Sequence, residues 1–253
     1  MSSVFDSHVF NANLFFPRKD NAPIPEYSEE IEIEVGQNAT VHARRHPSSK
    51  ARFSLLFFHG NGEIVSDYDN LAVHFNALGA ELIVVDFRGY GRSSGFPTLR
   101  STLEDAHKVF EQLKLTDKFK EKVCIMGRSL GSAPTIELCS KRSDITACVI
   151  ESGYADPVPL VERRGLRIDK TTPDEDAHFN NSEKIRMVKC PILIMHGADD
   201  VLISPYEAKL NYGNVKSKIK KLEILKGVGH NDMMMADSYF ITLKQFFDSW
   251  GSL

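Results

Sequence analysis

The chain is poor in cysteine, close to neutral in charge, and without a long apolar run. Its four cysteines in 253 residues include no CxxC pair, which excludes a disulfide-rich scaffold and favours buried free thiols. A net charge of −3, from 31 basic and 34 acidic residues, gives no general attraction to nucleic acid or an anionic membrane. No stretch approaches the roughly 18 apolar residues of a membrane span, and no signal peptide is visible. We therefore expect a cytoplasmic protein that neither crosses a membrane nor binds nucleic acid.

The length and composition fit a single domain over residues 1–253. Hydrophobic residues make up 42% of the chain and charged residues 26%, enough for a sizeable core without a disulfide or structural metal. Residues 1–30 mix proline with charge and are expected to form an irregular N-terminal arm. Residues 153–187 are polar, proline-containing and weakly periodic, which predicts a small cap or lid.

Strand and helix patterns alternate along most of the chain. Residues 31–35 and 40–45 alternate apolar with polar side chains around a turn signal at 36–38, which predicts an antiparallel hairpin at one sheet edge. Strands buried on both faces are expected at the continuous apolar runs 53–58, 82–85, 123–126, 145–150 and 192–195, and a further strand is expected at the more mixed run 222–225. Apolar stripes predict helices at 71–78, at 106–113 after a capping box at 101–104, and at 240–250. The fold class is therefore α/β, with a doubly wound, mostly parallel sheet.

A nucleophile is predicted in the sequence Gly127-Arg-Ser-Leu-Gly131. It matches G-x-S-x-G, follows an apolar strand and precedes a helical segment. Such a strand-to-helix turn presents a serine hydroxyl at the carboxyl edge of a sheet, beside the positive end of a helix. Ser129 is thus the candidate nucleophile, and a capping serine in a glycine-rich turn is the alternative.

A serine hydroxyl needs a general base, and His230 is the best placed of nine histidines. It lies in a glycine-rich loop between the last predicted strand and the last predicted helix, where catalytic groups are often carried. His59 and His196 each end a predicted strand as part of an HG pair and compete for this role. We expect these two imidazoles to bond loop backbone instead.

The base needs a carboxylate that fixes its tautomer and stabilises the imidazolium. Asp200 is the first choice, Asp199 is the second, and Glu151 at the end of another strand is a further candidate. Adjacent loop side chains usually diverge, so only one of the two aspartates is expected to face His230. The chain order Ser129, Asp200, His230 is the order found on this type of sheet.

Acyl transfer also requires N–H donors for an oxyanion. Leu130, which follows the nucleophile, can supply one from its backbone. The loop His59-Gly-Asn-Gly62 follows the first apolar strand, and the backbone N–H of Asn61 is the second candidate.

No cofactor or metal is expected. The loop 86–95 is rich in glycine but matches neither GxxxxGK[ST] nor GxGxxG, and a tight structural loop is the better interpretation. The acidic residues at 174–176 and 199–200 lack an accompanying His/Cys set with metal-ligand spacing.

Residues 201–203 and 233–235 flank the predicted triad loops and either line an apolar pocket or belong to the core.

Together these motifs resemble the α/β-hydrolase superfamily of serine hydrolases. The resemblance begins at about residue 53 and rests on HGNG at 59–62, DFRGYGRSSG at 86–95, GRSLG at 127–131, HGADD at 196–200 and GVGHND at 227–232. Within the superfamily the chain is similar to small, short-capped bacterial hydrolases related to acyl-protein thioesterase-like members. The resemblance implies the α/β-hydrolase fold with an eight-stranded sheet, a Ser–His–Asp triad and no cofactor.

The predicted function is a serine hydrolase that cleaves carboxylic ester or thioester bonds of a small-molecule substrate through an acyl-enzyme. One alternative is an aminopeptidase or amidase with the same triad, in which Glu162 or Asp169 would hold a substrate amine. Another is a non-catalytic small-molecule-binding protein on the same fold. The residues leave open the acyl chain length, the leaving group and the oligomeric state.

Overall fold

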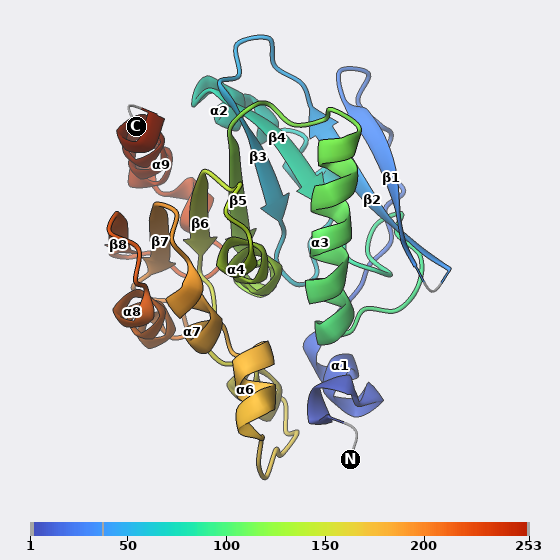
Figure 1. Ribbon diagram of the computed structural model, residues 1–253, viewed down its shortest axis with the longest axis vertical. Helices are drawn as coiled ribbons and strands as arrows, with labels where there is room; N and C mark the ends of the chain where they lie inside the picture. Colours follow the sequence, from blue (N-terminus) through green and yellow to red (C-terminus); the bar gives the residue numbers. More distant parts are fainter. Residues whose placement is uncertain (1–2, 37, 252–253) are drawn as a thin grey trace.

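The apolar runs form one mostly parallel sheet. The computed structural model describes residues 3–36 and 38–251, and its sheet has the order β1-β2-β4-β3-β5-β6-β7-β8 (Figure 1). β1 pairs antiparallel with β2, β2 pairs antiparallel with β4, and the other pairs are parallel. The strands are β1 (Glu29–Gly36), β2 (Ala39–His46), β3 (Phe53–Phe58), β4 (Ala80–Val85), β5 (Val123–Arg128), β6 (Ala147–Glu151), β7 (Ile192–Gly197) and β8 (Lys220–Leu225). The predicted fold class and its antiparallel N-terminal edge are confirmed.

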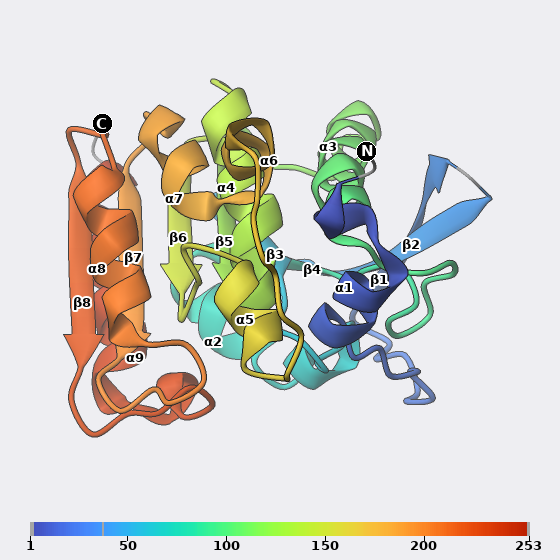
Figure 2. The ribbon, with the colours of Figure 1, turned by 90° about the horizontal axis from the view of Figure 1, so that it is seen from below.

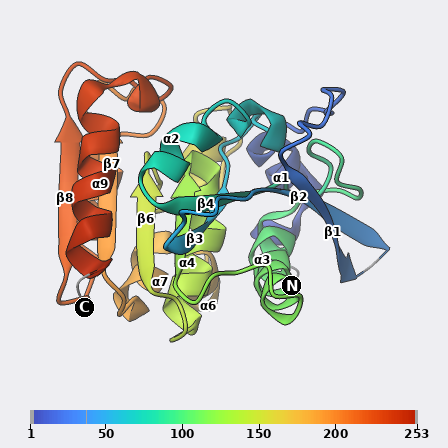
Figure 3. The same ribbon diagram turned by 90° about the horizontal axis from the view of Figure 1, so that it is seen from above.

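Helices cover both faces of the sheet (Figure 3). One face carries α2 (Ala72–Ala77) and α9 (Asp237–Gly251), whose apolar residues join one core cluster. The other carries α3 (Leu99–Leu115), α4 (Ser132–Lys141), α7 (Asn181–Lys184) and α8 (Pro205–Asn214). The structure therefore has three layers, as the alternation of strands and helices predicts.

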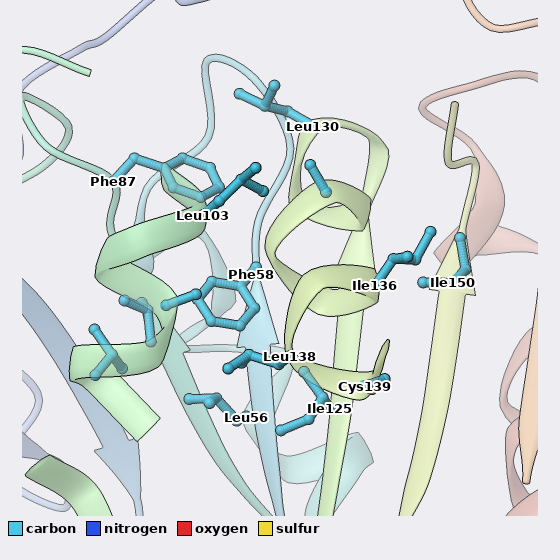
Figure 4. Packing of buried hydrophobic residues seen from close by; sticks show 14 of the residues in the cluster. Leu56, Phe58, Phe87, Leu103, Ile125, Leu130, Ile136, Leu138, Cys139 and Ile150 are labelled. Atoms are coloured by element: carbon cyan, nitrogen blue, oxygen red, sulfur yellow. The ribbon is translucent and has the colours of Figure 1, made fainter. Parts of the chain in front are cut away.

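β3 shows why the central strands are mostly apolar. Leu56 and Phe58 face the cluster that contains α3 and α4, whereas Leu55 and Phe57 face the cluster that contains α2 and α9. Figure 4 shows Leu56 and Phe58 packed with Leu103 of α3 and with residues of α4. A strand buried on both faces cannot alternate with polar residues, so it appears as a continuous apolar run.

The N-terminal segment is only in part the irregular arm that its composition predicts, because residues 15–28 contain no helix or strand but the residues before them are helical. It forms η1 (Val4–Asp6) and α1 (His8–Leu14), and the Ser7 hydroxyl caps α1 by accepting from the Phe10 N–H at 3.1 Å. Phe5 packs its ring 4.4 Å from that of Phe179, which comes from a distant segment. A helix of seven residues is too short to show a periodic signal, and it is stabilised by this tertiary packing. Residues 1–2 lie outside the described chain.

The segment 153–187 folds into short helices rather than an open loop. These are α5 (Val158–Glu162), α6 (Pro173–Phe179), α7 and η4 (Ile185–Met187). Figure 2 shows α5 near α1, and the two helices are in contact. Leu14 of α1 and Leu160 of α5 line the same cavity as Asn61, which follows β3, and Ser129, which follows β5. The helices α1 and α5 therefore lie over the edge of the sheet that carries the predicted site.

Smaller predictions need correction. α3 begins at Leu99, one turn earlier than expected, because the capping box is formed by Thr98 and Ser101 and not by residues 101–104. β6 begins at Ala147, not at residue 145. Of the four free cysteines, three are buried and Cys190 is half-buried. Gln37 of the predicted turn and the side chain of Trp250 in the last apolar stripe lie outside the described structure.

Candidate active site

Ser129 lies on the tight turn between β5 and α4, within the short 3-10 helix η3 (Ser129–Gly131). Its φ of 52° is in the left-handed region, which is strained for a residue with a side chain. A Cβ at position 127 would collide with the Gly131 carbonyl, and one at position 131 would collide with the Phe58 carbonyl. The two glycines of the motif therefore let β5, α4 and β3 approach closely around the serine.

The structure brings Ser129, His230 and Asp200 into one hydrogen-bonded line. The Ser129 Oγ lies 3.0 Å from the His230 Nε2, and the His230 Nδ1 lies 2.7 Å from the Asp200 Oδ2. An ionised carboxylate only accepts, so the Nδ1 carries the proton and donates to Asp200. The Nε2 is then free to accept the proton of the serine hydroxyl, as a general base must.

Asp200 is held in place and kept ionised by several donors. Its Oδ1 accepts from the N–H groups of Leu202 and Ile203 at 2.9 and 2.8 Å, and the His196 Nε2 lies 3.1 Å from its Oδ2. Burial opposes ionisation of this carboxyl, but the hydrogen bonds from His196, His230 and Ile203 outweigh it and lower the pKa of Asp200. The carboxylate is thus charged at neutral pH.

The alternative residues are placed elsewhere. Asp199 is exposed, and Glu151 is buried with its carboxylate bound to Arg128 and to the Tyr239 hydroxyl. The His196 Nε2 donates to the Ile203 carbonyl at 2.8 Å. The His59 Nδ1 lies 2.8 Å from the Gly60 carbonyl oxygen. Both histidines therefore bond loop backbone, as predicted.

The two candidate oxyanion donors meet at the same cavity. Asn61 and Leu130 line it together with Ser129 and His230. The Asn61 side chain is engaged elsewhere, since its Nδ2 donates to the Leu14 carbonyl and its Oδ1 accepts from the Tyr90 hydroxyl at 2.5 Å and the Phe16 N–H at 2.9 Å. These contacts fix the Asn61 side chain and tie the N-terminal segment to the predicted oxyanion loop.

The cavity has a volume of about 490 Å³, which suits a small organic substrate. Residues 201–203 line it, but residues 233–235 do not. Met233 is part of the core, whereas Met234 and Met235 line a neighbouring cavity of about 370 Å³. The apolar part of the lining comes from the N-terminal segment, the turn after β5, α5 and the loop after β7, with the residues Leu14, Phe16, Leu130, Leu160, Val201, Leu202 and Ile203.

Arg128, next to Ser129, organises the site and was not singled out by its pattern. Its Nη2 donates to the His230 carbonyl and to the Asn231 Oδ1, both at 3.0 Å. Its Nη1 and Nε donate to Glu63 and Glu151, the second at 3.1 Å. Burial disfavours the charged guanidinium, but these two carboxylates outweigh it and raise the pKa of Arg128. The only sequence signal was an arginine inside the serine motif, without an indication of its partners.

Comparison with known proteins identifies the family. A family model described as serine aminopeptidase, S33, matches residues 49–168. The human alpha/beta hydrolase domain-containing protein 17B is 31% identical over 208 residues, which cover 79% of this chain and 67% of that protein. The chain belongs to the α/β-hydrolase superfamily.

Other relatives extend this result. The alpha/beta hydrolase domain-containing protein aho-3 of Caenorhabditis elegans is 34% identical over 213 residues, or 80% of this chain. The present α/β-hydrolase spans 59% of the length of that relative. Protein bem46 of Schizosaccharomyces pombe is 29% identical over 248 residues, which cover 91% of this chain and 82% of bem46.

Solved structures share the fold of this α/β-hydrolase. The Pyrococcus furiosus esterase Pf2001 superposes with a TM-score of 0.75 at 17% identity, covering 94% of this chain and 98% of that one. A monoacylglycerol lipase of Paleococcus ferrophilus gives a TM-score of 0.66 at 18% identity, covering 83% of this chain and 99% of that one. Within residues 3–36 and 38–251, no helix has the length and apolar character that crossing a bilayer requires.

Proposed function

We propose that this α/β-hydrolase is a serine hydrolase of carboxylic esters or thioesters of small molecules. The observation that carries the proposal is the line from the Ser129 Oγ through the His230 imidazole to the Asp200 carboxylate, with separations of 3.0 and 2.7 Å. Ser129 is 8% exposed and lines the 490 Å³ cavity, so a substrate in this cavity reaches the hydroxyl. A chain that only bound a ligand would not need a base and an orienting acid behind the serine.

In the first half of the reaction, Ser129 attacks the acyl carbon. The His230 Nε2 accepts the hydroxyl proton as the Oγ–carbon bond forms, and Asp200 stabilises the resulting imidazolium. The backbone N–H groups of Leu130 and Asn61 donate to the oxyanion. His230 then returns the proton to the alcohol or thiol as its bond to the acyl carbon breaks, which leaves an acyl-enzyme.

In the second half, water takes the place of the leaving group. His230 accepts a proton from the water as its oxygen attacks the acyl carbon, and the same two N–H groups hold the second oxyanion. The ester bond to Ser129 breaks, His230 protonates the Oγ, and the carboxylic acid departs. No cofactor or metal enters either half, and the net reaction consumes one water per ester.

We also propose that residues 153–187 act as a cap over the site. Within residues 153–187, the described residues that line the cavity are Leu160 of α5 and, just after this helix, Arg163 and Arg164. The cap would therefore contact the substrate through α5 and its C-terminal end. The fold neighbours named above as an esterase and a monoacylglycerol lipase are compatible with ester hydrolysis, although their likeness is one of fold.

Hydrolysis of amides with a free amine is the weaker candidate. An ammonium group needs a carboxylate, and among the described residues that line the cavity none is acidic. Glu162 and Asp169, which could have held an amine, are exposed and are not among those lining residues.

The test combines labelling with turnover. The purified protein is treated with a fluorophosphonate probe and assayed on p-nitrophenyl esters of graded acyl length, beside Ser129→Ala and an exposed control, Ser143→Ala. We expect one adduct, on Ser129, and a kcat that falls by about 10⁴ or more in Ser129→Ala alone. A folded protein that neither reacts with the probe nor hydrolyses an ester or thioester would refute the proposal, while cleavage of aminoacyl-p-nitroanilides instead of esters would favour the amidase.

A further inference from the structure

We propose that the cavity accepts a substrate that carries an anionic group, a carboxylate or a phosphate, beside its acyl chain, and that Arg163 and Arg164 bind this group. The inference rests on the proposed hydrolase function and specifies its substrate class. It follows from the distribution of charge around the cavity.

Three arginines line the cavity, but only one has carboxylate partners. Arg128 is paired with Glu63 and Glu151, so its charge is compensated within the protein. Arg163 and Arg164 form no ion pair with any Asp or Glu of the described chain. Because no acidic side chain is found among the described lining residues, these two guanidiniums give the cavity an uncompensated positive charge.

The position of Arg164 is defined by the protein. Its guanidinium lies 4.2 Å from the centroid of the Phe16 ring, and its Nη1 donates to the Asn13 carbonyl. These contacts join the C-terminal end of α5 to the N-terminal segment. Partial burial lowers the pKa of Arg164, since water is lost without a carboxylate in return. Arg164 is still exposed to solvent, but these contacts fix it and no carboxylate neutralises it, so an anion that reaches it gains a charge-assisted hydrogen bond.

The remaining lining complements this charge. Leu14, Leu160 and residues 201–203 present apolar surface to the same space as Ser129. A substrate with an apolar chain and one negative group would contact both kinds of surface, whereas a substrate cation would meet two like charges. The anion could belong to the acyl part or to the leaving group, and both positions use the same guanidinium chemistry.

The leaving-group position is tested with three butyryl thioesters that differ in charge. The thiols are 3-mercaptopropionate, its neutral amide and the cation thiocholine, and release of each is followed with a thiol reagent. The acyl position is tested with the p-nitrophenyl hemiester of glutarate against p-nitrophenyl pentanoate. The proteins compared are wild type, Arg163→Gln, Arg163→Gln/Arg164→Gln and the control Arg167→Gln. Arg167 is exposed in the same loop but does not line the cavity.

We expect wild type to prefer the anionic member of at least one series by about tenfold in kcat/KM. Preference in the thioester series places the anion in the leaving group, and preference in the hemiester pair places it in the acyl chain. The double variant should reduce the ratio of kcat/KM for the anionic substrate to kcat/KM for its neutral counterpart to within about twofold, and Arg167→Gln should keep the wild-type ratio. Raising the salt concentration should weaken it, since these charges are accessible to ions.

The inference is overturned if wild type treats the three charges alike or favours the cation. It is also overturned if the preference survives in the folded double variant, or is lost equally in Arg167→Gln. The single variant Arg163→Gln covers the case in which the double variant does not fold. The described chain shows no side-chain bond of Arg163 that this change would break, so the single variant should fold. Turnover of neutral esters without an anion preference removes this inference only, whereas failure of every ester and of probe labelling removes the hydrolase proposal as well.

Discussion

The Oδ2 of Asp200 lies 2.7 Å from the Nδ1 of His230, while the preceding side chain, Asp199, is exposed to solvent. This relationship distinguishes two adjacent carboxylates that are chemically identical. Asp200→Asn keeps the shape of the side chain but places an amide against the imidazole, which favours the wrong tautomer. We expect kcat for ester hydrolysis to fall by about 10⁴ in Asp200→Asn, with the fold intact by circular dichroism.

Asp199→Asn is the matched control for this change, and its kcat should stay within about twofold of wild type. Rates of fluorophosphonate labelling should follow the same order, because they report the same activated hydroxyl. Equal losses in the two variants would argue against Asp200 as the orienting acid.

Most of the sheet and the candidate triad could be predicted because their signals are local. Apolar runs such as 53–58 mark strands buried on both faces, and the carboxyl ends of parallel strands meet at one edge. Ser129 and Asp200 follow the buried strands β5 and β7, and His230 follows the more polar edge strand β8, so their proximity is a consequence of topology.

Features that depend on distant packing could not be predicted in this way. The helix α1 is stabilised by contacts such as that of Phe5 with Phe179, which are separated by most of the chain. The partners of Arg128 come from three different segments, and no spacing rule selects Glu63 and Glu151 among 34 acidic residues. The choice between Asp199 and Asp200 likewise depends on loop geometry.

Arg128 is predicted to position His230 as well as to stabilise the fold. Arg128→Gln leaves Glu151 buried without its cation and removes a donor from the His230 carbonyl. We expect the free energy of unfolding to fall by about 3–5 kcal/mol. Below the unfolding transition, we expect kcat to fall more than KM rises. Arg128 lines the cavity, but its charge is paired with Glu63 and Glu151, and its bond to the His230 carbonyl is the contact through which the change displaces the base.

Tyr239→Phe separates these two effects. It removes the hydroxyl that donates to Glu151 at 2.6 Å but leaves every bond of Arg128 in place. Urea unfolding should show a loss of about 1–2 kcal/mol, with kcat within about twofold of wild type. A folded Arg128→Gln that retains the wild-type kcat would show that the arginine has no positioning role.

The Tyr90 hydroxyl is predicted to support the oxyanion loop. It donates to the Asn61 Oδ1 at 2.5 Å and accepts from the Phe16 N–H at 2.8 Å. Tyr90→Phe should lower the free energy of unfolding by about 1–2 kcal/mol and kcat/KM by severalfold, because Asn61 and the N-terminal segment lose a shared partner. The exposed Tyr206→Phe is the control and should change neither quantity. An unchanged kcat/KM in Tyr90→Phe would separate this contact from catalysis.

His46 is predicted to make folding sensitive to mildly acidic pH. The side chain is buried on β2, and neither ring nitrogen has a hydrogen-bond partner in the described structure. The pKa of His46 is lowered to about 4, mainly by burial. The nearby Arg44 guanidinium lowers this pKa further, whereas the Glu30 carboxylate raises it. Asp69, 3.4 Å away, is the other facing carboxylate. The folded protein therefore holds this imidazole neutral at a pH at which the unfolded chain protonates it.

The sign of the effect follows from this difference. The pKa of His46 is lower in the folded protein than in the unfolded chain, where it is about 6.5. The contribution of the neutral imidazole to the free energy of unfolding is therefore complete above pH 6.5 and is lost as the pH falls toward about 4. His46→Leu removes the titrating group and keeps an apolar side chain, so the free energy of unfolding of wild type relative to this variant should decrease by up to about 3 kcal/mol between pH 7 and pH 4. Urea titrations at several pH values measure it, with the exposed His8→Leu as control. A wild-type protein that loses no more stability than His46→Leu over this range would show that His46 is not the acid-sensitive group, and the coupled charges of Arg44, Glu30 and Asp69 would then be the next to test.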